Sequence, residues 1–208
     1  MATRTTAKTG GKNVDRFGSD YYTRFYLTPA TRAMSRAETE QRGRLIAAAV
    51  KQLDLPVRRI LDAGCGLGWF RKPLLQAFPR AVYVGVEFSE YLCATHGWTQ
   101  GSVVDYRSRS PFDLVICCDV LQYLDDRAAA RAIANLARLS RGAVYLHVPT
   151  EEDFKERMDP SGTDQNVYLR SGAWYRRRLD KYFVHVGFGL LVKRDVPLAQ
   201  WELEQTGN

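Results

Sequence analysis

The stretch Arg59–Phe70 reads RILDAGCGLGWF, and its three glycines stand at every second position. Residues 57–61 before them are expected to form a strand and residues 70–78 after them a helix, so the glycines lie where a strand turns into a helix. Glycine leaves the main chain uncovered and tolerates positive φ angles, and the first N–H groups of a helix lack partners. The stretch therefore predicts a loop against which a ligand lies close to the backbone.

The spacing of this loop excludes two common phosphate-binding motifs. A dinucleotide fingerprint would place its third glycine at position 69, where this chain has tryptophan, and no Lys-Ser/Thr pair follows as in a P-loop. Asp62 at the entrance gives a further indication, because a carboxylate repels a pyrophosphate and attracts the ammonium group of an amino acid. As an alternative, Asp62 could simply cap the turn.

Strand-like and helix-like segments alternate on both sides of the loop, which predicts an α/β fold with an open, mainly parallel sheet. A Ser35–Glu38 capping box marks the start of a long helix before the loop. The expected strands are 57–61, 81–86, 101–104, 112–118, 142–148, 183–193 and 198–204. The expected helices are 35–53, 70–78, 89–95, 126–139 and 172–182. Residues 150–170 are polar and are expected to be irregular.

Composition sets limits on the kind of protein. A chain of 208 residues with 45% hydrophobic residues can bury a sizeable core, and no apolar run reaches the 18 residues that suggest a membrane span. The start of the chain lacks the apolar part of a secretory signal, and the four cysteines form no CxxC pair. We therefore expect a cytoplasmic protein with reduced thiols, no membrane association and no metal; Cys93 and His96 alone do not form a metal site.

The positive charge lies entirely in the first part of the chain. Residues 1–60 contain 12 Lys/Arg and 5 Asp/Glu, which accounts for the whole net charge of +7. Either a polyanionic partner or a solvated tail explains this excess. We expect residues 1–14 to be a disordered basic tail and residues 15–208 to be a single domain in which 15–56 form an N-terminal helical lid.

The pattern D-x-G-x-G-x-G at Asp62–Gly68 resembles motif I of the class I S-adenosylmethionine-dependent methyltransferases. Three later stretches agree with that family in order and spacing: Glu87 at the end of the second strand, SVVDY at Ser102–Tyr106, and FDLVICCDVLQYLDD at Phe112–Asp126. The resemblance covers about residues 57–150. It implies a Rossmann-like sheet with helices on both faces and an antiparallel strand near the C-terminus, S-adenosyl-L-methionine as cofactor, and methyl transfer as activity.

The resemblance also implies residue roles. It assigns the ribose hydroxyls to Glu87, the adenine amino group to Asp105, and the methionine end of the cofactor to the segment after the fourth strand. As alternatives, Glu87 could be a carboxylate at a helix start and Asp105 an N-cap in a loop. The full set of implied cofactor-binding residues is Asp62, Gly64, Cys65, Gly66, Gly68, Glu87, Phe88, Val104, Asp105, Asp119 and Gln122.

The catalytic residues stay open on the sequence alone. Methyl transfer needs a general base only when the nucleophile must lose a proton. The family often has Glu-His after the fourth strand, whereas this chain has Gln122-Tyr123. Tyr123 and His147, near the end of the fifth strand, are the weak candidates for catalysis, and both could instead be packed side chains.

Three functions are compatible with these features. A small-molecule methyltransferase is favoured, because the chain is compact and the aromatic cluster at 17–26 could close over the site; the same cluster could instead anchor the segment to the core. A nucleic-acid or protein methyltransferase would use the basic N-terminus and WYRRR at Trp174–Arg178. A non-catalytic cofactor-binding protein is the third. The loop 153–170 is expected to determine acceptor specificity. The oligomeric state and the acceptor are not predicted.

Overall fold

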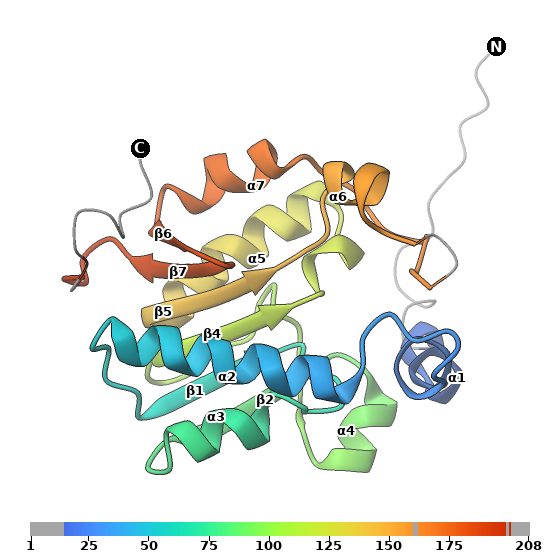
Figure 1. Ribbon diagram of the computed structural model, residues 1–208, viewed down its shortest axis with the longest axis horizontal. Coiled ribbons are helices and arrows are strands. Elements are labelled where there is room, and N and C mark those ends of the chain that lie inside the picture. Colours follow the sequence, from blue (N-terminus) through green and yellow to red (C-terminus); the bar gives the residue numbers. More distant parts are fainter. Residues whose placement is uncertain (1–14, 160–161, 199, 201–208) are drawn as a thin grey trace.

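The computed structural model describes residues 15–159, 162–198 and 200, and the expected tail at 1–14 lies outside this part of the chain. Seven strands form one sheet in the order β3-β2-β1-β4-β5-β7-β6 (Figure 1). β1 pairs in parallel with β2 and β4, whereas β7 is antiparallel to both β5 and β6. The strands are β1 (Arg59–Ala63), β2 (Val82–Glu87), β3 (Thr99–Gln100), β4 (Phe112–Cys118), β5 (Ser140–His147), β6 (Phe183–Gly187) and β7 (Leu190–Lys193). The expected open sheet with an antiparallel strand near the C-terminus is confirmed.

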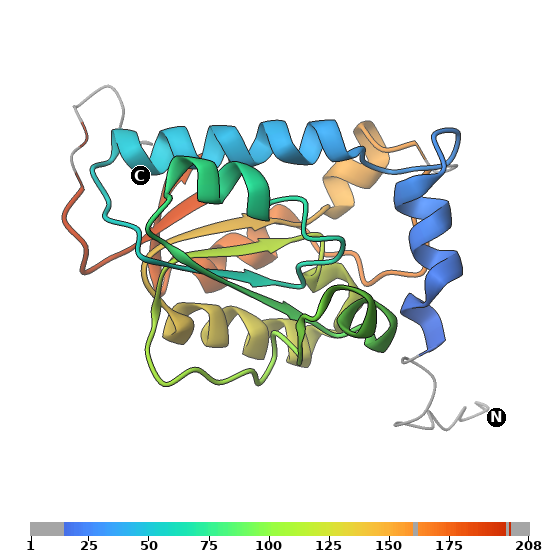
Figure 2. The same ribbon diagram turned by 90° about the horizontal axis from the view of Figure 1, so that it is seen from below.

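Helices cover both faces of this sheet (Figure 2). α2 and α3 lie on one face, and α5 lies on the other with α7 packed beside it. The helices are α1 (Ser19–Tyr22), α2 (Arg36–Gln52), α3 (Arg71–Ala77), α4 (Glu90–His96), α5 (Asp126–Leu139), α6 (Glu151–Glu156) and α7 (Gly172–Leu179), with single turns η1 (Asp15–Phe17), η2 (Thr23–Leu27) and η3 (Leu121–Tyr123). No helix in the described part of the chain is both long enough and apolar enough to cross a membrane.

The alternation of side chains along the strands divides the core in two. Ile60 packs against α2 and α3, while its neighbour Leu61 packs against α5 on the opposite face, and both are fully buried. Burying one such side chain contributes about 1.5–3 kcal/mol. The sheet is therefore held from both sides, which fixes the positions of the loops at its carboxyl edge.

The structure corrects several boundaries. β1 begins two residues later than expected, and the third strand is Thr99–Gln100 rather than 101–104. Val103 lies in a turn, and its apolar side chain is buried there. Its hydrophobicity therefore reflects packing in the core and not pairing within a strand. The segment 183–193, expected as a single closing strand, is a hairpin of β6 and β7 that turns at residues 188–189. Most of the other segment, 198–204, lies outside the described residues.

The region expected to be irregular contains α6. Thr150 and Asp153 form a reciprocal capping box at its start: the Thr150 hydroxyl accepts from the Asp153 N–H, and the Asp153 carboxylate accepts from the Thr150 N–H. This box satisfies two N–H groups that would otherwise lack partners and so stabilises a helix of only six residues.

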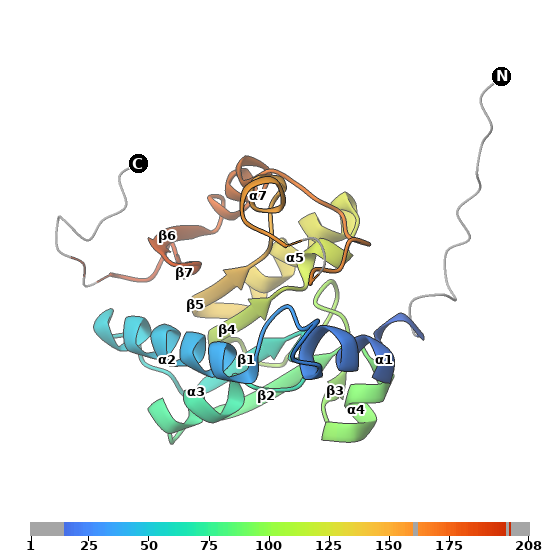
Figure 3. The same cartoon turned by 45° about the vertical axis from the view of Figure 1, so that its right-hand side comes forward.

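The N-terminal segment lies across the carboxyl edge of the sheet (Figure 2) and beside α4 (Figure 3). The Ser89 hydroxyl donates to the Phe17 carbonyl at 2.6 Å, and the rings of Tyr22 and Tyr91 stack with their centroids 6.5 Å apart. In open α/β sheets this edge binds ligands, at the point where the strand order reverses. Here that point lies between β1 and β4.

Candidate functional site

The loop after β1 has the backbone that its glycines predict. Gly64, Gly66 and Gly68 all have positive φ angles, of 83°, 52° and 70°. A Cβ atom at Gly64 would lie 2.3 Å from Val120, and one at Gly68 would lie 2.4 Å from Trp98. A Cβ atom at Gly66 would meet nothing within 4 Å. Gly64 and Gly68 are therefore required by packing, whereas Gly66 borders open space that a ligand can fill.

Asp62 is a buried carboxylate below this loop. It is 1% exposed and accepts a short hydrogen bond from the Tyr83 hydroxyl. Burial raises its pKa to about 7, although the hydrogen bond from Tyr83 acts in the opposite direction. Among the described residues, no basic side chain forms an ion pair with it. A buried carboxylate of this kind is stabilised by an incoming cation.

Glu87, at the end of β2, is held by main-chain donors. Its Oε2 atom accepts from the Gly66 N–H at 2.8 Å, and its Oε1 atom accepts from the N–H groups of Phe88 and Ser89 at 2.8 and 2.9 Å. The side chain is 6% exposed. These bonds fix the orientation of the carboxylate and leave lone pairs on both oxygens for further donors.

A cavity of about 180 Å³ lies beside the glycine loop. Gly64, Gly66, Glu87, Phe88 and Asp119 line it, as the sequence predicts for cofactor-binding residues. Cys65 lines a smaller cavity on the other side of the same loop, whose wall also includes Gly66 and Asp119. The loop thus presents its backbone to both cavities.

After β3, the residues that line the cavity beside the glycine loop come earlier in the chain than expected. Gly101, Ser102 and Val103 line the cavity, whereas Val104 packs against the core and Asp105 is exposed outside all three cavities. The sequence predicted a strand at 101–104, and the resemblance assigned Asp105 to the cofactor. The chain instead turns at Ser102, whose carbonyl accepts from the N–H groups of the residues three and four positions later.

A second, larger cavity of about 380 Å³ adjoins the first. Aromatic side chains of the N-terminal segment form part of its wall, and side chains from α6 and the following loop form another part. Tyr21, Tyr26, Asp119 and Tyr123 line both cavities. These four residues therefore mark the boundary between the two compartments.

The N-terminal aromatic cluster acts as both cover and anchor. Tyr22 is 6% exposed, whereas Tyr21 lies at the cavity boundary with its hydroxyl 2.6 Å from the Tyr123 hydroxyl. The rings of Phe17 and Tyr123 meet edge to face with centroids 5.1 Å apart. Burial raises the pKa of Tyr123 to about 12. Tyr123 therefore keeps its proton at neutral pH and is unsuited to act as a base.

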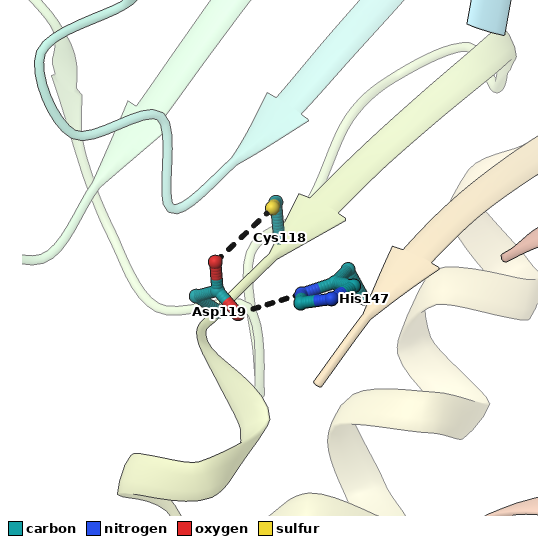
Figure 4. A group of neighbouring side chains, drawn as sticks. All are labelled: Cys118, Asp119 and His147. Atoms are coloured by element: carbon teal, nitrogen blue, oxygen red, sulfur yellow. Dashed lines mark hydrogen bonds and ion pairs between the residues drawn. The ribbon is translucent and has the colours of Figure 1, made fainter. Parts of the chain in front are cut away.

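Asp119 and His147 form a pair at the ends of neighbouring strands (Figure 4). Cys118 of β4 is the register partner of His147 of β5, and Asp119 follows with a φ of 56°, unusual for a residue other than glycine. This turn brings its Oδ1 atom 2.8 Å from His147 Nδ1, while its Oδ2 atom accepts from Cys118 Sγ at 3.4 Å. His147 lines the larger cavity and Asp119 lines both cavities, so the pair lies beside their common boundary.

Cys118, Asp119 and His147 have the ligand types of a metal site, and their ligand atoms lie within 4.8 Å of one another. Two observations oppose a cation there. The Arg42 guanidinium donates to Cys118 Sγ at 3.5 Å, and burial together with the negative charge of Asp119 raises the pKa of the Cys118 thiol. A protonated thiol is a poor metal ligand, so the group is better suited to holding protons.

Gln122 lies in the larger cavity and not in the one beside the glycine loop. It is 4% exposed, and its Oε1 atom has no hydrogen-bond partner within the described residues. An unpaired buried amide oxygen costs about 1–3 kcal/mol. The sequence assigned Gln122 to the cofactor, but its position favours contact with a second ligand.

Comparisons with known proteins agree with this geometry. Residues 61–143 match the model of a family described as a methyltransferase domain. The matched stretch covers less than half of the chain, running from β1 into β5, and it includes the glycine loop, Glu87 and Asp119. No curated protein is similar enough in sequence to match this chain.

Solved structures share the fold. A magnesium protoporphyrin IX methyltransferase from Synechocystis, with S-adenosylhomocysteine bound, superposes with a TM-score of 0.63 at 19% identity, covering 86% of this chain and 97% of that one. A sugar N-methyltransferase from a Streptoalloteichus species gives 0.61 at 18% identity, covering 93% and 98%. An amino pentose methyltransferase from Micromonospora echinaspora gives 0.57 at 15% identity, covering 74% and 90%.

The candidate site contains residues that no sequence motif indicated. Tyr83 and Trp98 support the glycine loop, and Arg170 supports the η3 turn. Arg170 is 4% exposed and donates to the carbonyls of Leu121 and Leu124, so it holds both ends of the turn that carries Gln122 and Tyr123. A lone arginine at the end of a polar loop carries no sequence signal for this role.

Proposed function

We propose that the protein transfers a methyl group from S-adenosylmethionine to a small-molecule acceptor bound in the larger cavity. The observation that carries this proposal is the common wall of the two cavities, formed by Tyr21, Tyr26, Asp119 and Tyr123. One compartment adjoins the glycine loop and the other adjoins the segment after β5. A methyl group can therefore pass between two bound molecules only across this boundary.

The residues around the smaller cavity suit the methyl donor. The Glu87 carboxylate, fixed by three main-chain N–H groups, is placed to accept from the ribose hydroxyls. Gly66 leaves room for the ligand against the backbone, and buried Asp62 supplies negative charge for the ammonium group. The bound donor supplies an electrophilic methyl group on a sulfonium. Tyr21 and Tyr26 line the boundary and help exclude water.

The acceptor compartment supports a small molecule. Rings of Phe25, Tyr26 and Phe154 contribute to its wall, and about 380 Å³ suits a compound of modest size. The names of the solved structures that share the fold also refer to small acceptors, a porphyrin and sugars. The four cysteines are free, which is consistent with our proposal that the reaction takes place in the cytoplasm.

The basic-aromatic stretch in α7 does not favour a nucleic-acid substrate. Tyr175 is 4% exposed and accepts from the Arg170 side chain. Trp174 stacks under Arg178, whose guanidinium carbon lies 3.6 Å from the ring centroid. Both rings are thus engaged within the fold and are not free to stack on bases.

The test combines cofactor binding with an acceptor screen. Calorimetry with S-adenosylhomocysteine should show binding to the wild type and a loss of about tenfold or more in Glu87→Gln, because one hydrogen bond to a charged group contributes about 1.5–3 kcal/mol. Glu90→Gln, in the exposed first turn of α4, is the matched control and should bind as the wild type does. An acceptor screen scored by the release of S-adenosylhomocysteine then measures turnover. Equal affinity in Glu87→Gln and the wild type would contradict the cofactor site, and binding without turnover on any acceptor would indicate a non-catalytic binder.

A further inference from the structure

We propose that His147 is the general base of the reaction, that Asp119 positions it, and that the acceptor is therefore a hydroxyl or amino compound that must lose a proton. This inference rests on the proposed function and adds to it a catalytic residue and a substrate class. It follows from three features at the boundary between the cavities: an oriented imidazole, an unpaired amide oxygen and the separation of both from the glycine loop.

The imidazole has one nitrogen engaged and one available. His147 Nδ1 is 2.8 Å from Asp119 Oδ1, and a carboxylate at this distance accepts the Nδ1 proton. Nε2 then carries a lone pair, and it has no hydrogen-bond partner within the described residues. Because His147 lines the larger cavity, this lone pair is available to a molecule bound there.

Asp119 is built into its position. Its positive φ and the bond from its N–H to the His147 carbonyl at 2.9 Å hold the residue between the ends of β4 and β5. A strained backbone conformation persists where the surroundings determine it, and it often occurs at functional sites. The charged and titratable groups near His147 are Asp119, Cys118 and, from α6, Asp153.

Gln122 supplies the recognition element. Gln122 lines the same cavity as His147, and its buried Oε1 atom lacks a donor within the described residues. A hydroxyl or amino group on the acceptor can donate to this oxygen and so remove its desolvation penalty. An acceptor without such a donor would leave the amide unpaired, which disfavours its binding.

The methyl donor, the acceptor and His147 account for every atom and electron of the step. The lone pair on the acceptor's oxygen or nitrogen forms the new bond to the methyl carbon, and the carbon–sulfur bond breaks with its electrons passing to sulfur. The proton of the acceptor passes to His147 Nε2, and Asp119 stabilises the imidazolium through Nδ1. The imidazolium then releases the proton to water. No other reactant is needed.

Two conservative variants test the base. His147→Asn keeps a donor near Asp119 and lacks a proton acceptor. Asp119→Asn suits the positive φ, because asparagine tolerates this region, but its amide favours the tautomer with a proton on Nε2. With the acceptor found in the screen, each variant should lower kcat by about 100-fold or more. Binding of the same acceptor, measured by calorimetry without the donor, should stay within about threefold of the wild type. His185→Asn is the matched control, because His185 pairs with Asp180 at 2.9 Å away from both cavities.

A second readout separates a base from a structural residue. At a saturating concentration of the methyl donor, so that the pH dependence of donor binding does not contribute, the acid limb of the pH profile of kcat/KM for the acceptor should disappear in His147→Asn. Substituted phenols can serve as probe acceptors. The reduction of kcat in this variant, relative to the wild type, should become smaller as the phenol hydroxyl becomes more acidic. A reduction of kcat that is the same for all the phenols would overturn the proposal that His147 is the base. Full activity in His147→Asn would also overturn it, and intact S-adenosylhomocysteine binding would leave the proposed function in place. Loss of acceptor binding with unchanged kcat would also overturn it.

Discussion

At the scale of single residues, the site depends on polar side chains that the fold has removed from water. Asp62 and Glu87 are both almost fully buried, yet their partners differ. Three N–H groups surround the Glu87 carboxylate, whereas Asp62 has only the Tyr83 hydroxyl. Glu87 is thus stabilised before the cofactor binds. We propose that Asp62 gains its remaining interaction partner only when the cationic group of the cofactor binds.

This difference predicts that cofactor affinity depends on pH. Because the pKa of Asp62 is raised to about 7 in the free protein, the ionised carboxylate is scarce below that pH and predominates above it. An ammonium group binds the ionised form, so S-adenosylhomocysteine affinity should increase about tenfold between pH 6 and pH 8. Calorimetry at several pH values measures this rise.

Two variants check the assignment to Asp62. Asp62→Asn cannot ionise and should show weaker binding with a flat pH profile. Tyr83→Phe removes the hydrogen bond that lowers the Asp62 pKa, so the rise in affinity should move to higher pH. A wild-type profile that is flat over this range would show that Asp62 does not meet the cofactor's cation.

At the scale of elements, the glycines of the loop between β1 and α3 have two different roles. Gly64 and Gly68 allow close packing, and Gly66 leaves space for a ligand. Trp98 from the start of β3 closes against Gly68 and donates from its indole N–H to the Gly66 carbonyl at 3.0 Å. Glu87 from β2 accepts from the Gly66 N–H. The loop is therefore held by two neighbouring strands, and only the Cα face of Gly66 is left open.

Replacing Gly66 by alanine should separate binding from stability. Its φ of 52° makes an L-residue cost about 1 kcal/mol, and the new methyl group would extend into the ligand's space. Gly97→Ala is the matched control: Gly97 has a φ of 70° with nothing within 4 Å of its Cβ position, and it lines none of the cavities. Urea unfolding should show similar losses for both. S-adenosylhomocysteine affinity should fall about tenfold in Gly66→Ala alone, and an equal fall in Gly97→Ala would mean that strain, not contact, controls binding.

The elements that local sequence determines were predicted well. The Ser35–Glu38 capping box starts α2 as expected, because both partners lie within one turn. The Asp119–His147 pair could not be predicted in the same way. It requires the register of β4 against β5 and a positive φ at an aspartate, and neither has a local signal. Likewise, the apolar pair Val103 and Val104 imitated a strand at 101–104, whereas the chain forms a turn there and Val103 is buried from it.

At the scale of the whole molecule, stability and function lie at opposite edges of the sheet. Asp113, at the amino end of β4, accepts from the main-chain N–H groups of Arg58 and Arg59 at 2.8 Å and from Arg141 Nε at 2.6 Å. Burial acts to raise its pKa, but these donors outweigh burial and lower it. One side chain thus joins the starts of β1, β4 and β5.

Removing this side chain should destabilise the fold without affecting the site. Asp113→Ala should lower the free energy of unfolding by about 2 kcal/mol at pH 7, because two buried N–H groups lose their acceptor. The pKa of Asp113 is lower in the folded state, so its electrostatic contribution is present above the unfolded pKa and is lost as pH falls through the folded pKa. The difference between variant and wild type in urea unfolding should therefore shrink toward pH 3. Cofactor affinity should stay unchanged, and a parallel loss of affinity would refute the separation of the two edges.

The anchoring by Arg170 has a practical consequence for redesign. The Thr150 capping box fixes one end of the polypeptide that encloses the larger compartment, and the Arg170 guanidinium fixes the other. Between these two points the chain can be exchanged for a segment of different length or chemistry, while the glycine loop and the His147 pair keep their places. Acceptor specificity could then be changed by replacing this one surface segment, without altering the glycine loop or the His147 pair.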